Sequence, residues 1–166
     1  GANIQRNPAS VMKLVTSLAA LEILGPAYQW KTQVYTTNPF VGPNLNGDLI
    51  FKGFGDPKLN LESFWMLLNK IRSRGIKNIR GNVILDRSFF KVPYHDPAAF
   101  DGNPHRPYNL GPDALMVNFR AININFIPDK KSKKINIHTV PKPEGLQIIN
   151  KLRMTRRACW SWPDKP

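Results

Sequence analysis

Cysteine is almost absent from this chain, since Cys159 is the one cysteine among 166 residues. A single thiol excludes an internal disulfide framework and says little about the redox compartment. Long apolar runs are missing too, because none approaches the roughly 18 residues that a membrane-spanning helix needs. The charged and apolar segments of a secretory signal peptide are also missing. We therefore predict no membrane span, whereas 42% hydrophobic residues suffice for one ordinary core.

Acidic residues are scarce relative to basic ones. Eleven Asp and Glu stand against 24 Lys and Arg, which gives a formal net charge of +13. Such a charge is compatible with nucleic acid, an anionic membrane face or an acidic polymer as a partner. Dense basic runs occur only at 130–134 and 153–157, and the chain lacks zinc-ligand spacing, an aromatic RNA-binding signature and a helix-turn-helix pattern. We therefore predict no nucleic-acid partner.

Residues 11–24 predict a long apolar helix. Pro8 suits the turn that leads into it, and neither Gly nor Pro interrupts it. Gly25 and Pro26 form a stop, since the first can turn left-handed and the second cannot continue a helix. The helix has almost no polar face, which predicts burial in a larger domain.

Ser10 and Lys13 are the candidate chemical groups of this helix. Residues three apart are neighbours on a helix, so the hydroxyl lies within reach of the amine. A lysine can activate a serine if burial or a second cation lowers its pKa. The alternative is a lysine whose stem packs while its ammonium group reaches water. Ser-x-x-Lys also recurs at Ser88 and Lys91, but that copy ends a strand-like run and opens no helix.

The rest of the chain predicts a mixed α+β arrangement. Strands are expected at 30–37 and 48–54, which would pair across a loop at 38–47. A helix is expected at 61–74 with Gly75 as its C-cap. Later strands are expected at 79–85, within 117–127 and at 134–140. Residues 145–152 fit either a helix or a strand, and 153–166 give no clear pattern.

Two loops are candidate binding sites. The glycine cluster at 53–57 could suggest phosphate binding, but it lacks the Gly-Lys-Ser/Thr ending. The long loop at 93–112 contains four potential metal ligands whose spacing fits no standard set: His95, Asp96, Asp101 and His105. We predict an exposed surface loop without a metal.

Residues 7–26, NPASVMKLVTSLAALEILGP, closely resemble the active-site helix of one enzyme family. These are the D-alanyl-D-alanine carboxypeptidase/endopeptidases of the penicillin-binding protein 4 type, or class C low-molecular-mass penicillin-binding proteins. The resemblance is collinear and covers nearly the whole chain. It continues in WKT at 30–32, VY at 34–35, GFGDPKL at 53–59, GNVILDRSF at 81–89, RPYN at 106–109 and ALMVNF at 114–119.

The resemblance implies both fold and function. Residues 1–28 would be part of a serine DD-peptidase/β-lactamase-like domain, and 29–166 an inserted α+β region that we expect to be incomplete at its C-terminus. The implied enzyme is a serine-type D-Ala-D-Ala carboxypeptidase/endopeptidase with Ser10 as nucleophile and Lys13 as base. Its partners would be peptidoglycan stem peptides and β-lactam antibiotics, in the periplasm or cell envelope, with no cofactor or metal. No substrate-binding residue is assigned.

Two motifs of this superfamily are missing from the chain. Its acyl enzymes combine Ser-x-x-Lys with Ser-x-Asn and Lys-Thr-Gly. Ser-x-Asn and Tyr-x-Asn do not occur here, and Lys31-Thr32 is followed by Gln33. In the resembled family both elements follow the insertion, so we expect a truncated chain that is inactive alone. The alternative is a non-catalytic, degenerate cell-wall-binding fragment.

Overall fold

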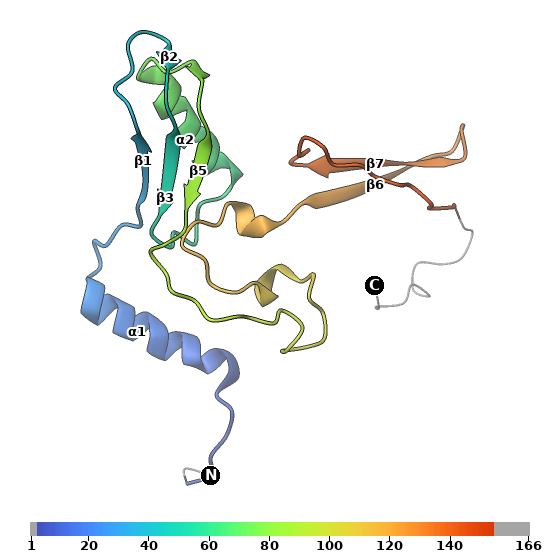
Figure 1. Ribbon diagram of the computed structural model, residues 1–166. Helices are drawn as coiled ribbons and strands as arrows, with labels where there is room; N and C mark the ends of the chain where they lie inside the picture. The colour runs from blue at the N-terminus through green and yellow to red at the C-terminus, as the bar shows by residue number, and fades with distance from the viewer. Residues whose placement is uncertain (1–2, 155–166) are drawn as a thin grey trace. The chain divides into compact units, whose positions relative to one another are not determined.

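The computed structural model describes residues 3–154, which fall into two compact units with a boundary between Phe119 and Arg120. Figure 1 shows the elements of each unit. The first unit contains α1 (Met12–Leu24), β1 (Thr32–Thr36), β2 (Asn44–Leu45), β3 (Leu49–Gly53), α2 (Leu61–Ser73), β4 (Asn78–Ile79) and β5 (Val83–Asp86). The second contains β6 (Asn123–Asp129) and β7 (Lys134–Val140).

A three-stranded sheet in the order β1-β3-β5 forms the frame of the first unit. β1 and β3 are antiparallel, with Thr36 opposite Leu49, which confirms the predicted pairing. β3 and β5 are parallel, and α2 is the crossover between them (Figure 1). α2 therefore runs against β3 and in the direction of β1. The predicted α+β class is confirmed.

The core lies between β3 and α2. Residues along β3 alternate between buried and half-buried, as expected for a strand with one covered face. Phe51 of β3 packs on Phe64 of α2 with the ring centroids 5.8 Å apart. The buried apolar residues of this cluster are Leu45, Leu49, Phe51, Leu59, Ile76 and Leu115. Leu115 comes from a segment far along the chain, so the core also fixes residues 113–115.

The ends of α2 follow ordinary capping chemistry. The Asn60 side chain accepts a 2.8 Å hydrogen bond from the Ser63 backbone N–H and so satisfies one free donor of the first turn. At the other end Arg74 is the cap and Gly75 follows with φ +105°. The predicted cap at Gly75 is therefore one residue late, although the glycine does supply the left-handed turn.

Three sequence expectations need correction. Residues 38–47 include β2, which pairs in parallel with β4 and is held by an Asn78–Asn44 side-chain bond of 2.9 Å. A two-residue strand has too short a pattern to predict. The strand expected within 117–127 begins only at Asn123, because 118–120 form a 3-10 turn with positive φ angles. Residues 145–152 form neither helix nor strand.

The second unit is a β-hairpin. β6 and β7 pair antiparallel over their full length, from Asn123 opposite Val140 to Asp129 opposite Lys134. Asp129 organises the turn by accepting bonds from Lys131 N–H at 2.9 Å and from Ser132 Oγ at 2.7 Å. The lysine-rich run at 130–134 is thus a hairpin turn. The strand predicted at 134–140 is confirmed.

The glycine cluster at 53–57 serves close packing of the backbone. Gly55 N–H donates a 2.8 Å bond to the Ala114 carbonyl, and Asp56 Oδ1 accepts from Lys58 N–H at 2.8 Å. A Cβ on Gly53 would lie 2.1 Å from the same carbonyl oxygen. The glycines therefore let the Ala114 segment approach β3.

We expect Gly53→Ala to lower the free energy of unfolding by about 3 kcal/mol, since overpacking against a backbone atom cannot be relieved by a side-chain rotation. The matched control is Gly102→Ala. Its new Cβ would meet no atom within 4 Å, and the left-handed φ of +72° alone should cost about 1 kcal/mol. Urea unfolding measures both changes. Equal losses would show that close packing at Gly53 is unimportant.

Limited proteolysis should cut first within 93–112. This segment has no α-helix or strand and is largely exposed, whereas 61–90 carries α2 and β5. Cleavage requires local opening, which is easiest where few elements hold the backbone. Mass spectrometry of early fragments would locate the cut, and early cleavage inside 61–90 would contradict this expectation.

Candidate active site

α1 presents its apolar residues to solvent. None of its residues is buried, and Leu14 and Ile23 are 72% and 80% exposed. Figure 1 shows the helix projecting from the sheet. The helix predicted at 11–24 is confirmed, and within the described residues nothing buries its apolar side chains. A large exposed apolar surface commonly marks a site of interaction with another protein segment.

A short 3-10 turn, Ala9–Val11, presents Ser10 at the start of this helix. Asn7 Oδ1 accepts a 2.9 Å bond from Ala9 N–H, and the Pro8 carbonyl accepts from Val11 N–H at 3.0 Å. Ala9 itself has a φ of +44°, a region that is costly for a residue with a Cβ. Such strain is often found next to functional groups, where the surroundings fix the backbone. The turn therefore holds the serine at a defined place at the helix end.

The structure brings the Ser10 and Lys13 side chains together. Lys13 Nζ donates to Ser10 Oγ at 3.5 Å, and both residues are exposed. The distance is long for a hydrogen bond but is compatible with a catalytic pair before substrate binds. An amine beside a hydroxyl at a helix N-terminus has the parts needed for nucleophilic attack: a nucleophile, a proton acceptor and a positive local potential.

The second Ser-x-x-Lys has a structural role for its serine. Ser88 lies in the turn directly after β5, so this copy follows a strand and opens no helix. Its Oγ donates to Asp86 Oδ1 at 2.6 Å, and its backbone N–H donates to the same oxygen at 2.9 Å. These bonds, led by that of the Ser88 side chain, lower the pKa of Asp86. Ser88 thus stabilises the turn that follows the last residue of β5.

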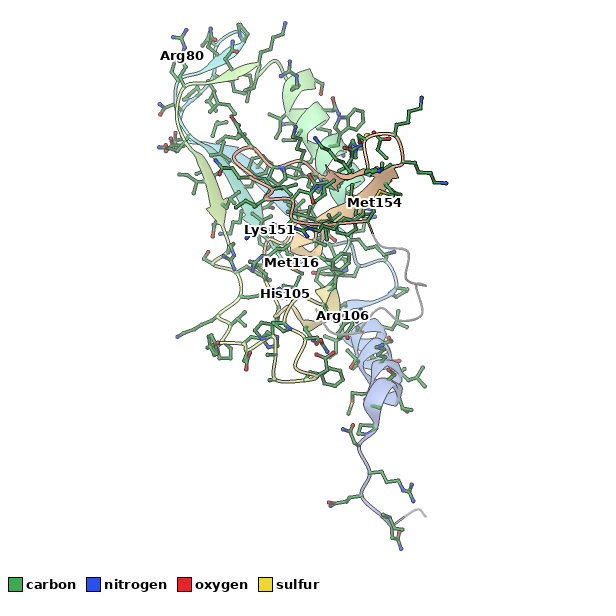
Figure 2. The ribbon with its side chains drawn as sticks, turned by 90° about the vertical axis from the view of Figure 1, so that its right-hand side faces the viewer. Arg80, His105, Arg106, Met116, Lys151 and Met154 are labelled. Carbon is green, nitrogen blue, oxygen red and sulfur yellow. The ribbon has the colours of Figure 1, made fainter. Side chains whose placement is uncertain are left out.

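The loop at 93–112 is organised around Asp101. Its carboxylate accepts bonds from Tyr108 OH at 2.7 Å and from the buried Asn109 Nδ2 at 2.6 Å. The Tyr108 bond is the largest cause that holds the pKa of Asp101 below its usual value. His95 Nε2 contacts the Asn109 carbonyl at 2.7 Å, and Figure 2 shows His105 on the same loop. Across residues 3–154 the structure has no group of three or more His, Cys, Asp or Glu side chains placed to hold a metal.

Another polar contact joins Arg87 to the buried Asp113. Arg87 Nε donates to Asp113 Oδ1 at 2.8 Å, and the Leu115 N–H donates to the same oxygen at 3.0 Å. A buried carboxylate needs such partners, so this pair fixes the segment that supplies Leu115 to the core. Arg87 lies inside the family-like segment 81–89 and Asp113 directly precedes the one at 114–119, but nothing in their spacing marks them as a pair.

The comparison with known families decides the affiliation. The sequence profile described as the D-Ala-D-Ala carboxypeptidase 3 (S13) family matches residues 1–164. The chain belongs to this family.

Individual relatives of this S13 chain agree with the family. It is 35% identical over 82 residues to D-alanyl-D-alanine carboxypeptidase DacB from Haemophilus influenzae. It is also 35% identical over 86 residues to a D-alanyl-D-alanine carboxypeptidase from an Actinomadura species. The two matches cover 49% and 50% of this chain but only 17% and 15% of those relatives. The matched part is thus a small share of each relative's length.

A solved relative shares the fold. The crystal structure of penicillin binding protein 4 from Haemophilus influenzae matches with a TM-score of 0.64 and 26% identity, over 78% of this chain and 29% of that one. The same protein in complex with a β-lactam matches with a TM-score of 0.53. The chain is therefore a partial penicillin-binding protein 4-type polypeptide of a serine carboxypeptidase family.

Two further observations concern parts of the chain outside the Ser10 turn. No helix within residues 3–154 has the length and apolar character needed to cross a membrane. Cys159 and the basic run at 153–157 lie wholly or mainly outside the described residues.

Proposed function

We propose that this chain carries the nucleophile helix of a serine D-Ala-D-Ala carboxypeptidase/endopeptidase. Ser10 would attack the peptide carbonyl, Lys13 would accept its proton, and Ser10 N–H would help to hold the oxyanion. The observation that carries this proposal is the 3.5 Å approach of Lys13 Nζ to Ser10 Oγ at the start of α1. The family match over 1–164 supports it.

The substrates follow from the same chemistry. An acyl-enzyme on Ser10 can form from a peptide that ends in D-Ala-D-Ala or from a strained β-lactam ring, since both present a carbonyl to the hydroxyl. A relative named penicillin binding protein 4, solved with a β-lactam, supports this assignment. Peptidoglycan stem peptides would then be the natural substrates, and the location would be the periplasm or cell envelope.

We further propose that residues 1–166 alone are a truncated and inactive form. The bare apolar surface of α1 and the lack of Ser-x-Asn and Lys-Thr-Gly both support this. Residues 1–28 would belong to the catalytic domain, and 29–166 to an insertion. The term family-length protein is used below for this chain extended by a C-terminal part that bears both motifs.

The test is release of D-Ala from a peptide ending in D-Ala-D-Ala by the family-length protein. We expect turnover that Ser10→Ala abolishes while the fold is unchanged by circular dichroism. Turnover that survives Ser10→Ala would overturn the assignment. The coding sequence after Pro166 separates the two candidate functions. In-frame Ser-x-Asn and Lys-Thr-Gly support the peptidase, whereas an early stop supports the non-catalytic cell-wall-binding fragment.

A further inference from the structure

An apolar groove runs along β1 beside α2, and no residue of the Ser10 turn lines it. Its cavity is about 300 Å³, at the lower end of the range for small-ligand sites. β1 contributes Thr32, Val34 and Thr36, which are alternate residues and therefore point to one face. The other lining residues are Phe40, Leu49, Leu67, Lys70, Ile71, Arg74 and Ile76.

Two cations border this apolar groove. Lys70 and Arg74 are four residues apart and so lie on the same side of the last turns of α2. Neither forms an ion pair with a carboxylate of residues 3–154. Basic residues at a helix C-terminus also offset the negative end of the helix dipole, but that end carries only about half a charge. Two full charges therefore leave a positive surplus at this end of the groove.

A buried hydroxyl lies at the other end. Thr32 Oγ1 is inaccessible to solvent and has no hydrogen-bond partner within the part of the chain that the structure describes. Because α2 runs in the direction of β1, its C-cap residue Arg74 lies toward Thr36, and Thr32 lies at the opposite end. The groove thus offers an apolar middle and a cationic end along one strand.

β1 is also an edge of its sheet. It pairs with β3 on one side, and no other strand of residues 3–154 pairs with its second edge. An exposed edge presents free backbone donors and acceptors that can pair with an added strand. The groove lies beside that edge, so the side chains of an added strand would face it.

We propose that the groove binds an extended peptide strand that pairs with β1 and carries a carboxylate where it passes Lys70 and Arg74. Its alternate apolar side chains fill the space between Val34 and Leu67. A plain acyl chain has no backbone groups that could pair with the β1 edge. The proposal uses no group of the Ser10 turn, so it stands or falls independently of the peptidase assignment.

Two synthetic peptides test this site: acetyl-Val-Thr-Val-Thr-Asp-amide and the same peptide with Asn in place of Asp. Their first, third and fifth side chains face the same way in an extended strand. We titrate each into ¹⁵N-labelled residues 1–166 and follow the backbone amides by NMR. Shifts should cluster at 32–36 and 67–76, and the Asp peptide should bind at least tenfold more tightly, since a charged pair outweighs a neutral bond.

Variants make the test specific. Arg74→Gln should remove most of the preference for Asp, whereas Arg72→Gln, on the same helix but outside the groove, should leave it unchanged. Equal affinity for the two peptides, shifts confined to α1 or β5, or no binding at millimolar peptide would each overturn the proposal.

Discussion

Lys13→Met in the family-length protein is expected to slow acylation of Ser10 by a β-lactam by about 100- to 10,000-fold, the range that general base catalysis contributes. Methionine keeps the unbranched stem, so helix packing changes little, but it cannot accept the serine proton. The measurement is the rate of acyl-enzyme formation under single-turnover conditions, and binding before the chemical step should change far less than the rate.

Lys91→Met is the matched control for this substitution. It removes the lysine of the other Ser-x-x-Lys, where Ser88 is already bonded to Asp86. The same substitution there should leave acylation unchanged. A similar loss at both positions would mean that overall charge or folding, and not the Ser10–Lys13 pair, controls the rate.

Residues 1–166 alone are expected to acylate at least about 10,000-fold more slowly than the family-length protein. The chain keeps the local parts of the site, which are the helix N-terminus and the Lys13 amine, whose Nζ lies 3.5 Å from Ser10 Oγ. A helix terminus contributes about 1 kcal/mol, which is under tenfold. The 166-residue chain lacks the Ser-x-Asn and Lys-Thr-Gly motifs that would supply a second oxyanion donor and a second cation. One missing oxyanion donor costs about 100- to 1000-fold, and an unaligned base costs a similar factor.

Mixing the two parts offers an independent check of this expectation. A separately expressed C-terminal part is added to residues 1–166. If covering α1 is enough to restore the site, this addition should raise the acylation rate and protect α1 from hydrogen exchange. A rate that stays at the level of the isolated chain, while α1 becomes protected, would show that covering the helix is not enough.

The long elements could be predicted from the sequence because they carry clear periodic patterns. α1, α2 and the β1–β3 pair have patterns of five residues or more that local chemistry decides. β2 was not predicted because two residues carry no period, and the single strand predicted at 79–85 is divided in the structure into β4, which ends at Ile79, and β5, which begins at Val83. The 3-10 turn at 118–120 escaped because its positive φ angles are imposed by packing, since Asn118 N–H bonds to the Leu59 carbonyl at 2.8 Å.

The candidate site divides in the same way. Ser10 and Lys13 could be paired from the sequence because three residues on a helix fix their separation. The groove over β1 could not, since it joins residues 32–36 to 67–76 through the β3–α2 crossover. The signal that was available was the spacing of Lys70 and Arg74 on a helix, and it is too common to identify a site alone.

The most direct test of the central claim is labelling by a fluorescent penicillin, read by intact mass and peptide mapping. We expect stoichiometric label on Ser10 of the family-length protein, and none on its Ser10→Ala variant or on residues 1–166 alone. Stoichiometric label on Ser10 of the 166-residue chain would contradict the proposal that the chain is inactive alone. Label that survives Ser10→Ala would contradict the assignment of Ser10 as the nucleophile.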